Sequence, residues 1–496
     1  MTRPSRLRPY GLPSMIGLLA GLAACAVGPK YVPPTPPVPP AYKEAPPASF
    51  QVMDGWKLAE PRDDIPRGSW WTLFQDPQLH ALHEQIDVSN QTLAAAEAQL
   101  RGARAAINVA RAATFPTVTG TVTATGTRPS LNRSASGSSS ASSPRANYQL
   151  PLDVAYEFDV WGRIRSTIDA NMATAQASAA DLESLRLSLH AELATNYFVA
   201  RGLDAQKQLL ELTIAAFERA LELTTNRYNQ GVASQIEVLQ ARTQLENTRA
   251  QAIDLGVQRS QVEHAIAILL GKPPAEFTLP PATMAIQPPA IPLGLPSELL
   301  ERRPDIAAAE RRVAAANAQI GVARAAFYPT VTLRSSVGFE SSSLTNLFSW
   351  PSVLWSLGAS LVEIAFDGGR REALTAQAQA AYEATVANYR QTVLIAFQNV
   401  EDQLAVLRIL EAEAQQQDKA VQTAGAVLTL ALNRYKGGIT TYLEVITAQS
   451  AALAAARTAI DLTTRRLTAS VLLIKALGGG WTPPDTAPID PIAKVR

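Results

Sequence analysis

Four stretches of the chain alternate apolar and polar residues with a period of two: about 115–126, 147–159, 328–340 and 353–366. In the clearest one, apolar side chains from Tyr148 to Phe158 share one face, and Gln149, Asp153 and Glu157 lie on the other. The last stretch is less regular. About ten residues of this pattern are typical of a membrane strand with apolar side chains toward lipid and polar ones toward a lumen. An amphipathic strand of a soluble sandwich is the alternative interpretation.

Helical spacing of apolar residues and alanines fills most of the remaining chain. One helical pattern runs from Leu79 to Ala113, and proline-free helices are predicted over 163–228 and 370–435. A helix of the length of 163–228 would extend about 100 Å, far beyond the usual length in globular proteins. After a break at Gly231, another helix is predicted to run to Leu270.

The second half of the chain repeats the first. The segment NRYNQGVASQIEVL (226–239) matches NRYKGGITTYLEVI (433–446), which lies 207 residues later. Likewise, INVARAATFPTV (107–118) matches IGVARAAFYPTV (320–331), which lies 213 residues later. Since the offset falls across the strands, we expect the second strand hairpin to have the shorter loop.

This repetition divides the chain into named parts. We predict a signal peptide (1–24), an N-terminal strap (25–68), a first repeat (69–272), a proline-rich linker (273–296), a second repeat (297–480) and a C-terminal tail (481–496). The strap carries nine prolines between positions 29 and 47, a composition that favours extended polyproline II structure.

The N-terminus has the pattern of a secreted lipoprotein. Three arginines precede a short apolar run, which is too short to span a bilayer as a helix. The only cysteine, Cys25, follows directly in the sequence Leu22-Ala23-Ala24-Cys25, which resembles a bacterial lipoprotein cleavage box. We therefore expect Cys25 to carry acyl chains that anchor the chain, and Ala26 after it favours the outer membrane.

Composition and motifs give no support for catalysis or nucleic-acid binding. The net charge is +1, and neither a GxxxxGK phosphate loop nor an HExxH motif is present. We expect His80 and His83 to be solvated helix positions and His190 and His264 to be isolated. We predict no enzyme activity, catalytic residue, metal or cofactor.

Four strands cannot close a membrane barrel, because about eight is the smallest number that closes. An open sheet edge in lipid would leave backbone groups without hydrogen bonds, at several kcal/mol for each group. Identical chains are therefore expected to share one barrel. Two chains would supply about eight strands and three about twelve, and this argument leaves the choice open. A coiled-coil scaffold is an alternative for the helices, but it does not explain the strands.

Several longer motifs then resemble one family, the outer-membrane efflux factors of the TolC and OprM type, in particular their NodT-like lipoprotein branch. They are CAVGPKYVPP (25–34), SWWTLFQDPQL (69–79), FDVWGRIR (158–165), LLERRPDIAAAE (299–310), FYPTVTL (327–333) and the two RY-x-x-G turns. The resemblance covers nearly all of the chain after residue 24.

The resemblance implies an α+β membrane protein that forms a homotrimer. The fold it implies is TolC-like: a 12-stranded β-barrel, four strands per chain, continuous with a long periplasmic α-helical barrel. It also implies localisation in the outer membrane with a lipid anchor, and partnership with a periplasmic adaptor (membrane fusion) protein and an inner-membrane pump of the RND type. The expected function is a passive conduit that exports small molecules such as drugs. A conduit for type I protein secretion is one alternative, and a lipid-anchored periplasmic scaffold without a pore is another.

The resemblance also assigns roles to residues of the two turns. Tyr435 and Glu237 match a tyrosine and a carboxylate that bond to hold the tunnel closed, and Glu444 matches an acidic ring in the lumen. The turns would dock the adaptor through Gly231, Val232, Gly438 and Ile439. Two positions depart from the family pattern: Thr440 stands where some members have a gating arginine, and Thr447 where many have an aspartate.

Overall fold

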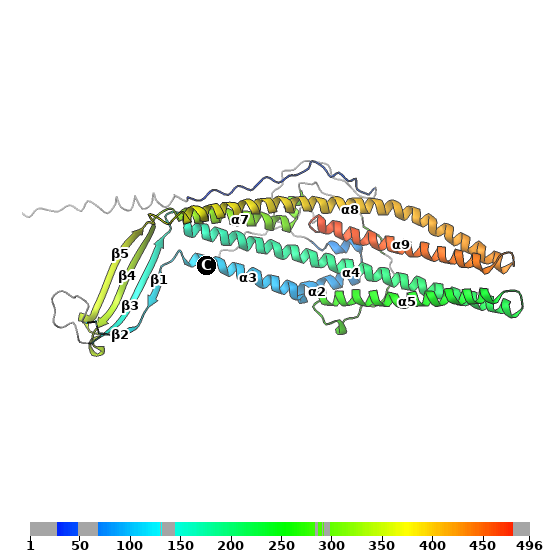
Figure 1. The fold of residues 1–496 in the computed structure, drawn as a ribbon, viewed down its shortest axis with the longest axis horizontal. Coiled ribbons are helices and arrows are strands. Elements are labelled where there is room, and N and C mark those ends of the chain that lie inside the picture. Colours follow the sequence, from blue (N-terminus) through cyan, green and yellow to red (C-terminus); the bar gives the residue numbers. More distant parts are fainter. Residues whose placement is uncertain are drawn as a thin grey trace, which may run out of the picture. The chain divides into compact units, whose positions relative to one another are not determined.

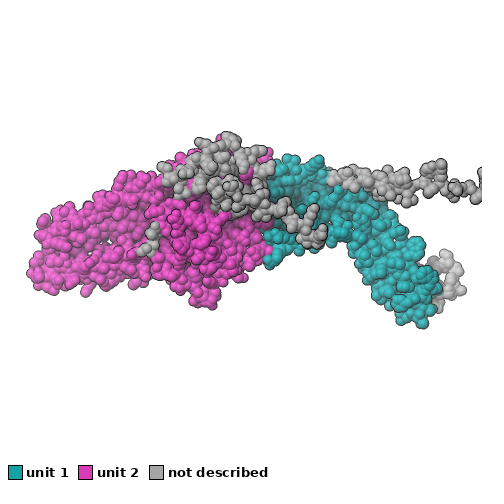
Figure 2. Space-filling view, turned by 180° about the vertical axis from the view of Figure 1, so that it is seen from behind, with its two compact units in different colours: residues 1–34, 100–178, 309–388 teal, residues 35–99, 179–308, 389–496 magenta. Residues whose placement is uncertain are grey.

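The computed structural model describes residues 27–47, 68–128, 130, 144–282, 286–289, 291 and 298–479. The predicted signal peptide, Cys25 and the predicted tail lie outside the described residues. The chain forms two compact units (Figure 2). Unit 1 comprises 1–34, 100–178 and 309–388, and unit 2 comprises 35–99, 179–308 and 389–496. Each unit takes segments from both sequence repeats, so the repeats are not the compact units.

Unit 1 contains one antiparallel sheet (Figure 1). Its strands are β1 (Thr117–Gly120), β2 (Thr123–Thr127), β3 (Arg145–Phe158), β4 (Thr330–Ser341) and β5 (Val353–Val362). β1 and β2 both pair with β3, which pairs with β4, which pairs with β5. The predicted strands are therefore present, but the predicted fourth strand ends at Val362 rather than at 366.

The strand register places most of the apolar residues of the strands on one face. Leu152 of β3 pairs with Val337 of β4, which pairs with Trp355 of β5. On the same side of β3, Val118 of β1 pairs with Val154. These side chains are largely exposed: Val118 63%, Val337 50% and Trp355 78%. The opposite face carries polar residues, including Asp153, Ser336 and Ser356, which pair across the same strands. In the chain as described, an apolar sheet face has no protein against it.

The predicted first strand is interrupted at residues 121 and 122, where β1 ends and β2 has not begun. The register is unbroken, because Gly120 pairs with Leu152 and Thr123 with Gln149. Thr121 therefore lies opposite Pro151, and it donates its N–H to the Pro151 carbonyl at 3.1 Å. Proline has no N–H to return this bond. The prediction of one continuous strand was wrong at this point.

The helical pattern at 79–113 forms two helices, α2 (Pro77–Ser89) and α3 (Gln91–Ala112), where we predicted one. Asp76 caps α2 by accepting the N–H groups of Gln78 and Leu79. Asn90 separates the helices: its Oδ1 accepts the N–H of Leu93 at 2.9 Å, and its Nδ2 donates to the Leu269 carbonyl at 2.7 Å. A side chain that caps a new helix competes with continuation of the old one.

The helices of the two repeats match in length. α4 (Arg163–Asn229) and α8 (Arg370–Lys436) have 67 residues each, and α5 (Gln235–Leu269) and α9 (Tyr442–Ala476) have 35 each. The shorter α3 and α7 (Pro304–Ala325) both have 22 residues, and α6 (Glu298–Arg302) precedes α7. The predicted ends of the long helices are correct within a few residues. Among the described residues, we find no helix with the length and hydropathy of a membrane span.

The described part of the N-terminal strap, residues 27–47, contains neither helix nor strand and is held by specific hydrogen bonds. In unit 1, Asn317 donates to the Pro29 carbonyl at 3.0 Å, and the Tyr31 hydroxyl bonds to the Glu310 carboxylate. In unit 2, the Glu401 carboxylate accepts the N–H groups of Lys43 and Glu44 at 2.7 and 2.8 Å. The described part of the strap is therefore docked on both units.

Candidate functional site

In unit 2, two tight turns connect the long helices at their ends, α4 to α5 and α8 to α9. Each turn has a glycine with φ +74°, Gly231 in the first turn and Gly438 in the second. The N–H of Val232 bonds to the Arg227 carbonyl at 2.8 Å, and the N–H of Ile439 bonds to the Arg434 carbonyl at 3.0 Å. This is the Schellman pattern, which needs a left-handed residue and so favours glycine. The two turns are thus the same structure at equivalent positions of the two repeats.

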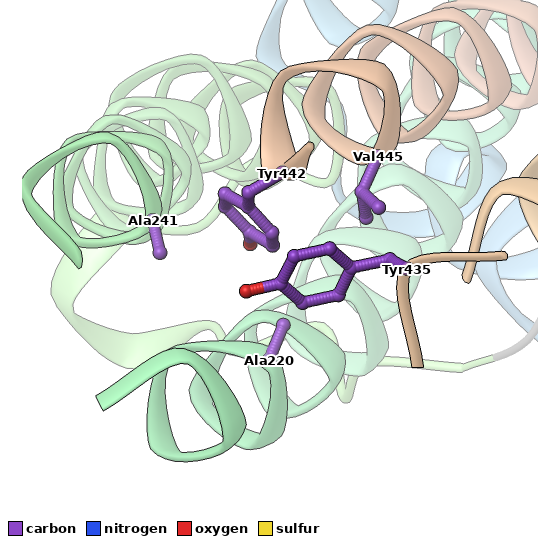
Figure 3. Close-up of a cluster of buried hydrophobic side chains, with 5 residues drawn as sticks. All are labelled: Ala220, Ala241, Tyr435, Tyr442 and Val445. Carbon is purple, nitrogen blue, oxygen red and sulfur yellow. The ribbon is translucent and has the colours of Figure 1, made fainter. Parts of the chain in front are cut away.

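Close to the two turns, buried side chains from both hairpins form a small cluster (Figure 3). It consists of Ala220, Ala241, Tyr435, Tyr442 and Val445. The rings of Tyr435 and Tyr442 lie 5.3 Å apart, and each tyrosine is 1% exposed. The cluster brings α4 and α5 of the first repeat against α8 and α9 of the second.

Tyr435 is the centre of the polar contacts in this cluster. Its hydroxyl donates to Oε2 of Glu237 at 3.1 Å and lies 3.4 Å from Oγ1 of Thr224. Thr224 gives its own hydrogen to the Ala220 carbonyl at 2.8 Å, so Thr224 and the Glu237 carboxylate are both acceptors of the tyrosine hydroxyl, and the contact with Glu237 is the shorter one. The contact between Tyr435 and Glu237 that we predicted is therefore present.

Burial raises the pKa of the tyrosines of the cluster further above neutral pH. Burial is the main cause that raises the pKa of Tyr435, and the nearby Glu237 carboxylate raises it further. Burial also raises the pKa of Tyr442 to about 12. At neutral pH the Tyr435 hydroxyl is thus a hydrogen-bond donor, as its contact with a carboxylate requires.

The other predicted site residues lie at the surface of the turns. Val232 is 63% and Ile439 is 72% exposed. Glu444 is exposed on the first turn of α9, and its carboxylate has no hydrogen-bond partner among the residues described. Two residues of the second tip differ from the family pattern described above. The hydroxyl of Thr447 donates to the Leu443 carbonyl at 2.9 Å, whereas the hydroxyl of Thr440 is buried and has no partner within the described part of the chain.

The structure adds one residue that we did not single out. Nη1 of Arg227 donates to the Tyr435 carbonyl at 2.6 Å, and its guanidinium carbon lies 4.5 Å from the centre of the Tyr435 ring. The only sequence signal was its place in the repeated Asn-Arg-Tyr motif, which both turns contain.

The expectation of solvated or isolated histidines was wrong for His83 and His190. They are 0% and 3% exposed, and their Nδ1 atoms lie 2.8 Å apart. The ring of Trp71 stacks on both, at 4.3 Å from His83 and 4.6 Å from His190. Burial lowers the pKa of His83 to about 2, and it also lowers the pKa of His190. Within unit 2, this cluster packs Trp71, which precedes α2, and His83 of α2 against His190 of α4.

No group of three or more His, Cys, Asp or Glu side chains within the described ranges could hold a metal ion. Cys25, the predicted site of lipidation, lies outside these ranges. The structure thus describes two elements that bear on function: a sheet with an exposed apolar face, and a pair of long helical hairpins whose ends meet at Tyr435. Together they are typical of an outer-membrane channel with a helical periplasmic part.

Comparison with known proteins agrees with this class. The sequence matches the profile of the outer membrane efflux protein family over residues 82–272 and 295–479. It is 34% identical to the pyoverdine export outer membrane protein OpmQ of Pseudomonas putida, over 90% of this chain and 94% of that one. It is 33% identical to the toluene efflux pump outer membrane protein TtgC of Pseudomonas putida, over 93% of each chain.

Solved structures show the same fold. The outer-membrane channel OprN, 32% identical, superposes with a TM-score of 0.82 over 92% of this chain and 100% of that one. CusC, 27% identical, has a TM-score of 0.81 over 92% of this chain and 100% of that one. The chain belongs to the outer membrane efflux protein family and has the α+β TolC-like fold. It is the outer-membrane channel of a tripartite efflux system, as predicted from the sequence.

Proposed function

We propose that three copies of this chain form one passive channel, with a 12-stranded barrel that continues into a tunnel of helices. The sheet edges are the observation that carries this proposal. β1 and β2 pair only with β3, and β5 pairs only with β4, within the described part of the chain. Both edges would be open in lipid, where each unpaired backbone group costs several kcal/mol. Neighbouring copies remove this cost by pairing β5 of one with β1 and β2 of the next.

The faces of the sheet support the same arrangement. The exposed apolar face, with Trp355, Leu357 and Leu361 between 67% and 78% exposed, would contact lipid. The polar face would line a water-filled lumen. A scaffold without a pore offers no reason for an apolar face of this size to remain uncovered.

The tips of the helical hairpins would form the closed end of the channel. In this proposal the hydrogen bond from Tyr435 to Glu237 keeps the second hairpin against the first, and the exposed Glu444 of three chains forms an acidic ring. Movement of α8 and α9 away from α4 and α5 would break the bond and widen the entrance. The gate in this proposal therefore includes the hydrogen bond between Tyr435 and Glu237, which joins the two hairpins of each chain.

The cargo in this proposal is a small molecule. The relatives are named for the export of pyoverdine and toluene, both small compounds. The chain would itself supply no energy and no catalysis, and an inner-membrane pump of the RND type would drive transport. A periplasmic adaptor would contact the turns at Gly231, Val232, Gly438 and Ile439, where Val232 and Ile439 present apolar side chains to solvent. Type I protein secretion is the alternative cargo class.

We also propose that acylated Cys25 anchors the strap in the outer membrane. The docked strap residues on units 1 and 2 support an N-terminus that is held along the body rather than free. Labelled palmitate should be incorporated by the wild type and not by the Cys25→Ser variant. Equal labelling of both would contradict the anchor.

The channel itself is tested by mass and by conductance. Native mass spectrometry of the protein in detergent should give a mass of three chains, and the same preparation should conduct ions in planar bilayers. A monomer without conductance would contradict the channel and leave the scaffold. Deletion of the gene for this chain should make the host cells more sensitive to small toxic compounds. If the cells instead keep their normal sensitivity but retain a protein that they otherwise export, protein secretion is favoured.

A further inference from the structure

The two tips are built from the same sequence motif but use it differently. Arg227 and Tyr228 in the first tip correspond to Arg434 and Tyr435 in the second, 207 residues later. Tyr228 is 42% exposed, whereas Tyr435 is 1% exposed and lies at the centre of the cluster. Arg434 is exposed, whereas Arg227 is partly buried. The equivalent residues therefore occupy different environments although the turns are the same.

Arg227 contacts Tyr435 in two ways. Its Nη1 donates to the Tyr435 carbonyl at 2.6 Å, an oxygen that already accepts the N–H of Gly438 at 3.0 Å. Its guanidinium carbon lies 4.5 Å from the centre of the Tyr435 ring. The first contact places a positive charge at the carbonyl end of α8, and the second places it over an aromatic face; both are favourable.

These contacts fix the tyrosine at its main chain and ring, while Glu237 holds its hydroxyl at 3.1 Å. Arg227 lies in the last turn of α4 and Glu237 in the first turn of α5, so both belong to the first hairpin. The residue they hold belongs to the second hairpin. A separation of the hairpins would thus break three contacts with one residue.

We propose that Arg227 is a positioning residue of the gate: it orients Tyr435 for its bond to Glu237 and resists opening. This inference rests on the proposed gate at Tyr435. Arg227 as an ordinary charge at the end of its own helix is the competing explanation, and it would apply equally to Arg434.

The experiment compares single-channel currents of the full-length trimer in planar bilayers for wild type, Arg227→Gln, Arg227→Lys and Arg434→Gln. Arg227→Gln should raise the ratio of open to closed current levels, on the order of tenfold if the cation–π contact and its hydrogen bond are both lost. Arg227→Lys should recover part of the closed level, since it keeps the charge but not the planar fork. Arg434→Gln should leave the currents unchanged.

A second measurement isolates the ring contact. Phenylalanine analogues with increasing numbers of fluorine atoms at position 435 weaken the negative ring face and leave the carbonyl in place. The open fraction should rise with fluorine number in the Arg227 background and stay constant in the Arg227→Gln background. Because the reference for these channels is the Tyr435→Phe variant, loss of the tyrosine hydroxyl does not affect the trend.

The outcomes separate this inference from the gate itself. If Tyr435→Phe and Glu237→Gln change the currents but Arg227→Gln does not, the gate stands and the role of Arg227 is wrong. Equal effects of Arg227→Gln and Arg434→Gln, or a fluorine trend that does not depend on Arg227, would also overturn it. If none of the variants at 227, 237 and 435 changes the currents, the proposed gate itself fails.

Discussion

The hydroxyl of Tyr435 donates to Oε2 of Glu237 at 3.1 Å, across 198 residues of sequence and between the two helical hairpins. The equivalent carboxylate of the other repeat, Glu444, is exposed and has no such partner among the described residues. The duplication therefore supplied two similar tips, of which one provides the hydrogen-bond donor and the other the acceptor. A contact between repeats can report or control their separation, which a contact within either repeat cannot.

Replacing this bond should open the channel without unfolding it. Tyr435→Phe keeps the ring in the cluster and removes one hydrogen bond, a loss of about 1 kcal/mol per chain. We expect a larger open fraction in planar bilayers, with the amount of trimer unchanged. Glu237→Gln should act in the same direction because it replaces a charged acceptor with a neutral one. Glu222→Gln is the matched control, because Glu222 is an exposed carboxylate of α4 outside this contact. An equal rise in that variant would show that charge near the tip, not this bond, sets the closed level.

A single glycine should be essential for the sheet. Gly338 of β4 pairs with Pro151 of β3, and a Cβ built on it would lie 2.2 Å from the Leu150 carbonyl oxygen and 2.6 Å from Cα of Pro151. Both are main-chain atoms, so the strands would have to move apart. Gly338→Ala should destabilise the sheet by about 2 kcal/mol and lower the yield of folded trimer.

Gly358 of β5 provides the control for that substitution. A Cβ there would have no described atom within 4 Å. Gly358→Ala should therefore give a normal yield of trimer, measured by gel mobility before and after heating. A normal yield for Gly338→Ala as well would mean that β3 and β4 can separate locally at little cost.

The glycines of the two turns should respond differently from a helical glycine. Gly438 has φ +74°, a conformation that costs an alanine about 1 kcal/mol, so Gly438→Ala should lower the melting temperature. Gly256 lies inside α5 with no described atom within 4 Å of a built Cβ, so Gly256→Ala should raise it through helix propensity. Circular dichroism in detergent measures both. The two substitutions should change the melting temperature in opposite directions. A lower melting temperature in both variants would contradict the argument from φ.

The parts of this fold that follow from local periodicity could be predicted. In any strand, alternation with a period of two places Leu152 and Val154 on the same face, and the strand pairing of β3 confirms that they share a face. The long helices follow from the absence of proline and glycine over many residues, and the duplication checks one repeat against the other. The TolC-like fold and the efflux function were recognised from motifs spread along the whole chain.

The parts that depend on contacts distant in sequence could not be predicted. The break at Asn90 comes from a side chain that caps α3 and also bonds to Leu269, which lies 179 residues later. The choice of Tyr435 over Tyr228 for the buried position is not visible in two nearly identical motifs. Arg227 was missed for the same reason, since its role exists only when the second hairpin packs against the first. His83 was assigned to solvent and His190 was expected to be isolated, because nothing near either in sequence indicates its partner.

That histidine pair gives a prediction about acid. Burial lowers the pKa of His83 from 6.5 to about 2 in the folded chain, with the adjacent His190 as a smaller cause. Between these values the unfolded chain binds a proton that the folded chain does not, so stability is complete above about pH 6.5 and falls as the pH is lowered. Each such proton changes the free energy of unfolding by at most about 1.4 kcal/mol per pH unit.

The charged groups around the two histidines determine how much of the loss of stability in acid each histidine causes. His190 faces Asp87 at 3.5 Å, which favours its charged form, and Arg186, which opposes it; burial is the larger effect and lowers its pKa. The Nδ1 atom of His80 accepts the Trp71 N–H at 2.9 Å, and His80 is the third cause that lowers the pKa of His83. Substituting His83 alone should thus remove only part of the acid sensitivity, and substituting both buried histidines should remove more.

The measurement is the melting temperature of the trimer at pH 7.5, 6 and 5 for wild type, His83→Leu and His264→Leu. The wild type should lose stability steadily below about pH 6.5, because its buried histidines resist protonation. His83→Leu should show a smaller loss, whatever its stability at pH 7.5, since only the slope reports the proton. His264 is exposed on α5, so His264→Leu should keep the wild-type slope. Equal slopes in all three proteins would show that acid acts elsewhere, and that His83 takes up its proton in the folded chain as easily as in the unfolded one.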